Sequence, residues 1–136
     1  MTIEPALEQN DRLIDEFGRY LLCVIVQKLD TALVDSKVTE LQRRKICSVF
    51  TDSLASFLDY GWLASEDDET LWPLVAFAER KESDHGVEVP LRVIVPTKES
   101  YLGEGGAEGA IALRFEQNPE IQEWLAFRSG LRGESP

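Results

Sequence analysis

Apolar residues recur at steps of three and four positions through the first sixty residues, as they do along one face of an α-helix. A first stripe predicts a helix and consists of Leu13, Phe17, Tyr20, Leu21, Val24, Ile25, Lys28 and Leu29. A second stripe predicts another helix and consists of Val38, Leu41, Ile46, Val49, Phe50, Leu54, Phe57 and Leu58. A short turn at residues 34–37 joins them, so we expect an antiparallel helical hairpin.

Local signals suggest where these helices begin and end. Asp35 or Ser36 can cap the start of the second helix, and Gly61 can close its end in the left-handed conformation. Pro5 suits the first turn of a helix near the start of the chain. The sequence leaves open whether residues 1–30 form one helix or two.

The spacing then changes to the alternation of a β-strand. Residues 86–95 predict a strand with Val87, Val89, Leu91, Val93 and Val95 on its buried face, and Pro90 favours an edge position. Residues 71–80 are its expected partner across a polar loop at 79–86, although 71–79 would also suit a buried helix apart from Pro73. Residues 110–116 predict a third strand, with one side made of Ile111, Leu113 and Phe115.

Asn118, Pro119 and Glu120 are typical of a helix start, and an apolar face follows at Ile121, Trp124 and Leu125. The expected fold is therefore α+β: an antiparallel helical hairpin packed on a small antiparallel three-stranded sheet, with a short C-terminal helix. We expect one domain over residues 1–130 and a frayed tail at 131–136, with the strand order left open.

Composition narrows the kind of partner. The chain has 136 residues and a formal net charge of −11. A surface this acidic would repel nucleic acid or an anionic membrane, and it favours a basic protein as the partner. The basic run Arg43-Arg44-Lys45 lies in the second helix and is expected on its solvated face. No apolar run predicts a membrane span and no secretory signal is visible; Cys23 and Cys47 are expected as buried thiols, so we expect a cytoplasmic protein.

Three features resemble catalytic or ligand sites but lack the required pattern. In the glycine-rich residues 101–110, Glu108 stands where a dinucleotide fingerprint needs its third glycine, and no lysine follows as in a P-loop; a flexible acidic connection is expected. The acidic run 66–69 lacks the alternate spacing of a calcium loop. His85, the only histidine, lies in a turn-forming Asp-His-Gly segment. We therefore predict no catalytic residue, cofactor or metal.

The aromatic residues around the acidic run suggest a binding surface. From Asp59 to Glu79 the chain has six acids and no base, and two tryptophans flank the acidic run. Aromatic anchors beside acids can recognise a basic protein. The predicted partner-binding residues are Trp62, Glu66, Asp67, Asp68, Glu69 and Trp72. The alternative is that both tryptophans cover the core where the helices meet the sheet.

The leading functional hypothesis is a small acidic protein-binding module without catalysis, which covers a basic protein partner as an immunity protein, antitoxin, chaperone or anti-defence protein does. A homodimer through the helical hairpin is also expected, because its apolar face is wider than three strands can cover. One alternative is a small-molecule-binding domain or enzyme, with Trp72, His85 and Tyr101 near a pocket between sheet and helices. Another is a subunit of a larger assembly.

Overall fold

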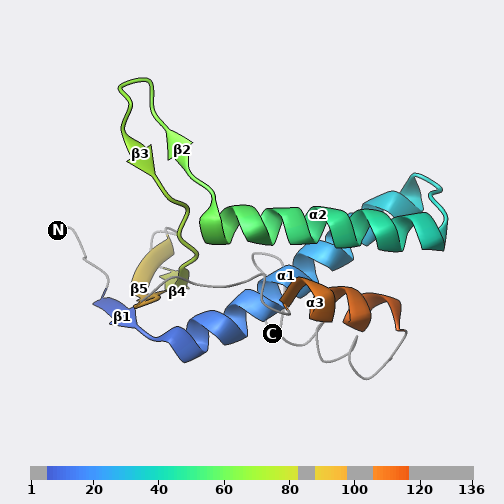
Figure 1. Ribbon diagram of the computed structural model, residues 1–136. Helices are drawn as coiled ribbons and strands as arrows, with labels where there is room; N and C mark the ends of the chain where they lie inside the picture. The colour runs from blue at the N-terminus through green and yellow to red at the C-terminus, as the bar shows by residue number, and fades with distance from the viewer. Residues whose placement is uncertain (1–5, 83–87, 98–105, 117–136) are drawn as a thin grey trace.

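A computed structural model describes residues 6–82, 88–97 and 106–116. Within them, three helices accompany a three-stranded sheet and a separate two-stranded one, which confirms the α+β class (Figure 1). The expected C-terminal helix from Asn118 lies outside the described residues. The elements in chain order are β1 (Ala6–Gln9), α1 (Asp11–Asp35), α2 (Glu40–Tyr60), β2 (Leu63–Ala64), β3 (Thr70–Leu71), β4 (Phe77–Glu82), β5 (Glu88–Val95) and α3 (Gly106–Phe115).

The start of α1 differs from the expectation placed on Pro5. Pro5 itself lies outside the described residues, but the next residues form β1 rather than a helical turn. The helix begins after Asn10, whose side-chain Oδ1 accepts a hydrogen bond from the backbone N–H of Leu13 at 3.1 Å. This is the geometry of an N-cap, and it lets a single continuous helix follow the strand.

The turn between α1 and α2 lies two residues further along the chain than predicted, at residues 36–39. The predicted caps Asp35 and Ser36 belong to the end of α1, where the Ser36 N–H donates to a carbonyl of the last turn. Lys37 takes the left-handed conformation at φ 63°, and Thr39 caps α2. The two helices then run in opposite directions and pack together, as predicted (Figure 1).

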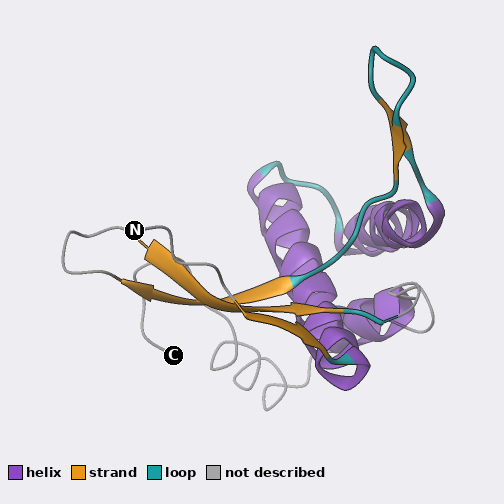
Figure 2. Ribbon diagram, turned by 90° about the vertical axis from the view of Figure 1, so that its left-hand side faces the viewer, coloured by secondary structure: helices purple, strands orange, loops and turns teal. Residues whose placement is uncertain are grey.

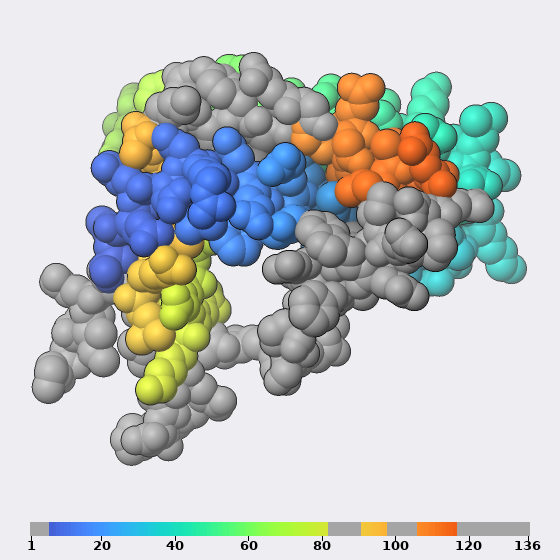
Figure 3. All heavy atoms as spheres, turned by 90° about the horizontal axis from the view of Figure 1, so that it is seen from below, coloured from blue at the N-terminus to red at the C-terminus, as the bar shows by residue number. Residues whose placement is uncertain are grey.

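The hydrophobic core lies among the three helices. Figure 3, seen from below, shows α3 lying beside α1, and α3 also packs against α2. Each helix contributes small or apolar side chains, so that the backbones approach closely. The buried members are Leu22, Cys23, Val26, Cys47, Ala55, Ala110, Ile111 and Phe115.

Residues 110–115 belong to helix α3, and the prediction of a strand over 110–116 was wrong. Its buried residues fall at helical spacing, at Ala107, Ala110, Ile111 and Phe115, so the apparent alternation coincided with a helical face. The helix also takes in the end of the glycine-rich segment. A β-carbon on Gly106 would lie 2.9 Å from Leu22 Cδ1, which shows how closely α3 approaches α1.

The three-stranded sheet is mixed rather than antiparallel, with the order β1-β5-β4. β1 pairs in parallel with β5 through residues 92–95, and β4 pairs antiparallel with β5. β5 is therefore central, and the edge position predicted from Pro90 was wrong. Pro90 is tolerated because β1 does not extend along that part of β5, and the register shifts next to it, at Glu79/Arg80.

The covered face of β5 is opposite to the predicted one. Ile94 is buried at 4% exposure, whereas Leu91 is 44% exposed. Phe77 of β4 is paired with Ile94, and its ring centroid lies 5.5 Å from that of Phe17 on α1. Residues directly opposite each other share a face of the sheet, so the face of Ile94 and Phe77 is the one that α1 covers.

The central strand is also held to both neighbours by one side chain. Arg92 Nε donates to Glu79 on β4 at 2.7 Å, and its terminal nitrogen donates to both carboxylate oxygens of Glu8 on β1 at 3.1 Å. This arginine therefore fixes the register of three strands that come from distant parts of the sequence. The sheet extends from the N-terminal end of α1, away from the helical core (Figure 2).

Candidate functional site

A two-stranded hairpin projects from the C-terminal end of α2, away from both α1 and α3 (Figures 1 and 2). We call residues 62–72 the arm. Its strands β2 and β3 pair Leu63 with Leu71 and Ala64 with Thr70. Every residue of the arm is exposed. All six predicted partner-binding residues lie on it, including both tryptophans.

The tip of the arm carries the acidic run. Ser65 closes the turn: its N–H donates to the carbonyl of Glu69 at 2.8 Å, its carbonyl accepts from the Asp68 N–H at 3.0 Å, and its Oγ accepts from the Glu69 N–H at 3.1 Å. Asp68 is left-handed at φ 62°, a conformation that aspartate tolerates better than most residues. The hydrogen bonds use backbone groups and a serine, so the four exposed carboxylates at 66–69 are carried on an ordered turn.

The base of the arm carries the aromatic residues. Trp62 is 58% exposed and Trp72 is 64% exposed, so neither covers the core. In the register of the hairpin, the two tryptophans lie one position beyond the Leu63–Leu71 pair, one on each side of the base of the arm. Since neighbouring strand positions alternate between faces, the leucines share one face of the arm and the tryptophans the other.

Gly61 joins the arm to α2. Its backbone is extended, at φ −75° and ψ 166°, rather than left-handed as predicted for a helix end. What requires glycine here is close approach: a β-carbon would lie 2.5 Å from the carbonyl oxygen of Phe57 and closer still to its ring. The absence of a side chain therefore lets the arm leave the helix at a sharp angle over Phe57.

A second exposed apolar surface lies next to the arm. We call it the free face of α2 and define it by Ile46, Val49, Phe50, Ser53 and Phe57, which recur at helical spacing. Its apolar members are 41–60% exposed. The buried residues of the same helix, Cys47, Thr51 and Ala55, lie on the opposite side. The free face of α2 is therefore a contiguous exposed apolar surface, separate from the core.

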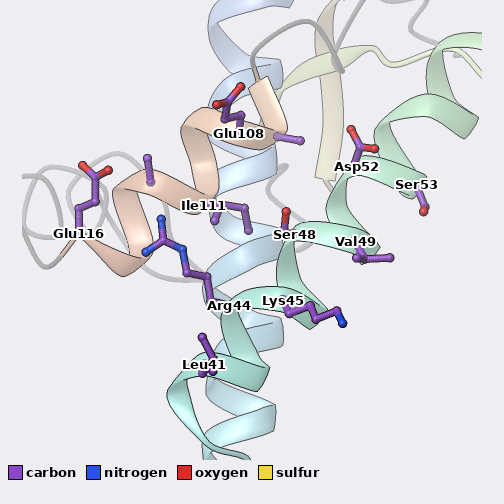
Figure 4. Close-up of a pocket in the computed structure, with 12 residues that line it drawn as sticks. Leu41, Arg44, Lys45, Ser48, Val49, Asp52, Ser53, Glu108, Ile111 and Glu116 are labelled. Carbon is purple, nitrogen blue, oxygen red and sulfur yellow. The ribbon is translucent and has the colours of Figure 1, made fainter.

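A groove of about 770 Å³ separates α2 from α3. Figure 4 shows Arg44 and Ser48 of α2 turned toward α3, with Ser48 beside Ile111, whereas Lys45, Val49 and Ser53 point away from α3. The groove is open and is lined by side chains of both charges.

A buried ion cluster was not predicted from the sequence. Asp30 of α1, whose side chain is 6% exposed, accepts hydrogen bonds from Arg43 Nε of α2 at 2.8 Å and Arg114 Nε of α3 at 2.9 Å. A terminal nitrogen of Arg43 also donates to the Val38 carbonyl at 2.9 Å. Arg43 is half-buried in this cluster, so its predicted place on the solvated face was wrong, while Arg44 and Lys45 are exposed as predicted. The cluster ties the three helices together.

Both cysteines are buried free thiols. Burial raises the pKa of Cys23, and burial followed by the nearby Asp30 carboxylate raises the pKa of Cys47, against the opposing arginines. A raised pKa keeps a thiol protonated near neutral pH, so neither cysteine is activated as a nucleophile.

The alternative small-molecule site has little support in the described part of the chain. Trp72 lies on the arm and not between sheet and helices, and His85 and Tyr101 lie outside the described residues. Among the described residues, no three His, Cys, Asp or Glu side chains are placed to share a metal ion. None of the described helices has an apolar stretch long enough to cross a bilayer.

Comparison with known proteins assigns no relative to this chain. No protein-family model matches it, and no curated protein and no solved structure resembles it significantly.

Proposed function

We propose that this protein is a binding module without catalysis, and that it binds a basic protein partner through the arm. The observation that carries the proposal is the exposure of every residue from Trp62 to Trp72. Two tryptophans and two leucines on one short projecting hairpin are far more apolar surface than a solvated loop needs.

The stability of the arm supports the same proposal. A two-stranded hairpin by itself is marginally stable in water, and β2 and β3 have only two residues each. Covering the arm with a partner would bury its apolar side chains and supply the free energy that the bare hairpin lacks. Tryptophan is also among the residues that contribute most of the binding energy at protein interfaces.

The arrangement of charge suggests the order of events on binding. The acidic tip projects furthest from the helices, so its field meets a basic partner first and steers the encounter. The tryptophans at the base then anchor the complex by burial. The protein would act by covering its partner, as an immunity protein, antitoxin, chaperone or anti-defence protein does.

Charge reversal at the tip tests this proposal. We expect Glu66→Lys, Asp67→Lys and Asp68→Lys together to lower partner capture from the protein's own cell at least about tenfold, because steering and rim contacts are lost. Capture by the wild-type protein should also fall as salt is raised. The measurement is affinity capture at low and high salt, quantified by mass spectrometry.

The matched control reverses three exposed acids elsewhere: Asp15, Asp35 and Glu116. Its net charge equals that of the tip variant, so it separates a local effect of the arm from overall charge. Equal capture by wild type and tip variant, or equal losses in tip and control variants, would exclude the acidic tip as the recognition surface.

A further inference from the structure

The free face of α2 has the spacing of a helix–helix contact. Ile46, Val49, Phe50, Ser53 and Phe57 follow steps of three and four, and Tyr60, 61% exposed, continues them to the end of the helix. α1 and α3 pack on other sides of α2, so the free face has no cover from the described residues. A stripe one helix long fits another helix laid along it.

Charges on one flank of this stripe indicate what that helix is. Lys45 and Asp52 are both exposed and lie seven residues apart, which places them within about 20° on the same flank of α2. A second α2 running parallel would put each lysine level with the other lysine. A second α2 running antiparallel about a two-fold axis would put each Lys45 level with the Asp52 of the other copy. The flank is therefore complementary to itself in the antiparallel orientation only.

We propose that the free face of α2 is covered by the same face of a second copy of this chain, packed antiparallel about an axis near Ser48 and Val49. This goes beyond the proposed function, because the arm is not part of the core of this contact. In a two-fold interface each residue is used twice, so two equivalent Lys45–Asp52 pairs form at its rim.

The apolar surface available suits a dimer of moderate strength. Phe50 and Phe57 each offer roughly 150–250 Å² when fully buried, and about half of each is exposed here. With Ile46 and Val49 the stripe supplies on the order of 350 Å². A standard interface buries about 800 Å² per partner, so the polar rim supplies the remainder.

The dimer would present two arms. Each arm leaves the C-terminal end of its own α2, and antiparallel packing puts these ends at opposite ends of a helix pair about 30 Å long. A partner with two basic sites could engage both arms, and its apparent affinity would then exceed that of one arm.

The test is sedimentation velocity of the purified full chain over a wide concentration range. We expect wild type to dimerise, and Lys45→Asp and Asp52→Lys each to weaken dimerisation about tenfold or more through like charges. The combined Lys45→Asp, Asp52→Lys protein should recover to within about threefold of wild type, because the pairs form with signs exchanged. Phe50→Glu should weaken it at least about 100-fold, since the axis brings the two new charges together.

Circular dichroism of each variant checks the fold, and the tip variant of the arm serves as a control that should dimerise like wild type. A wild-type monomer at all concentrations would overturn the inference, as would a dimer that the single charge changes leave intact. Failure of the charge exchange to rescue would overturn the antiparallel two-fold arrangement. None of these outcomes bears on partner capture by the arm, so the two proposals fail separately.

Discussion

Replacing Asp30 with alanine is expected to lower the free energy of unfolding by about 3–5 kcal/mol, because it leaves two inward-facing arginines without a counter-charge. The Asp30 side chain is 6% exposed and is the acceptor for both Arg43 and Arg114. The loss would be felt by all three helices at once, since each contributes one member of the cluster. Urea denaturation followed by circular dichroism measures the change.

Two further variants separate the ion cluster from a general effect of mutation. Asp35→Ala removes an exposed carboxylate from the same helix and should change stability by no more than about 0.5 kcal/mol. Replacing all three members, with Asp30→Leu, Arg43→Met and Arg114→Met, should recover most of the loss, because no buried charge then lacks a partner. A change of less than about 1 kcal/mol in Asp30→Ala would contradict the role assigned to the cluster.

Removal of either tryptophan of the arm should cost most of the binding energy for the partner. We expect Trp62→Ala and Trp72→Ala each to reduce partner affinity at least about 30-fold, which corresponds to roughly 2 kcal/mol, the threshold of an interface hot spot. Both side chains are mostly exposed, so the free energy of unfolding should stay within about 0.5 kcal/mol of wild type. Capture titrations and urea denaturation measure the two quantities.

Leu7→Ala is the matched control, since Leu7 is 73% exposed on β1 and far from the arm in sequence. It should leave capture unchanged. Loss of capture in the control to the same extent as in the tryptophan variants would mean that exposed apolar surface of any kind binds the partner. The arm would then not be a specific binding site.

The helical hairpin could be predicted from the sequence because both helices follow a clear three-four rhythm over twenty or more residues. The segment 110–116 is too short to show such a rhythm. There, apolar residues at every second position resembled a strand, although Ala107, Ala110, Ile111 and Phe115 form one helical face. The burial of β5 was assigned to the wrong side for a related reason: Ile94 sits among apolar residues on both faces, so alternation alone does not decide which face α1 covers.

Contacts between distant residues account for the other differences. The parallel pairing of β1 with β5 joins Ala6 to Arg92, and no local pattern indicates such a partner. No local pattern indicates the hydrogen bond from Arg114 to Asp30 either, because the two residues are 84 positions apart in the sequence. By contrast, the composition of the arm can be recognised from one short stretch of the sequence. Its acids and tryptophans could be singled out from sequence, while the hairpin that exposes them could not, because residues 71–80 were interpreted as one strand.

The most direct measurement of partner binding by the arm is site-specific photocrosslinking in the protein's own cell, with benzoylphenylalanine in turn at Trp62, Trp72 and Leu7. We predict crosslinks from positions 62 and 72 to the same basic protein, and none to that protein from position 7. Absence of crosslinks at both arm positions, equal adducts from position 7, or adducts confined to a second copy of this chain would contradict the binding of a basic protein partner by the arm.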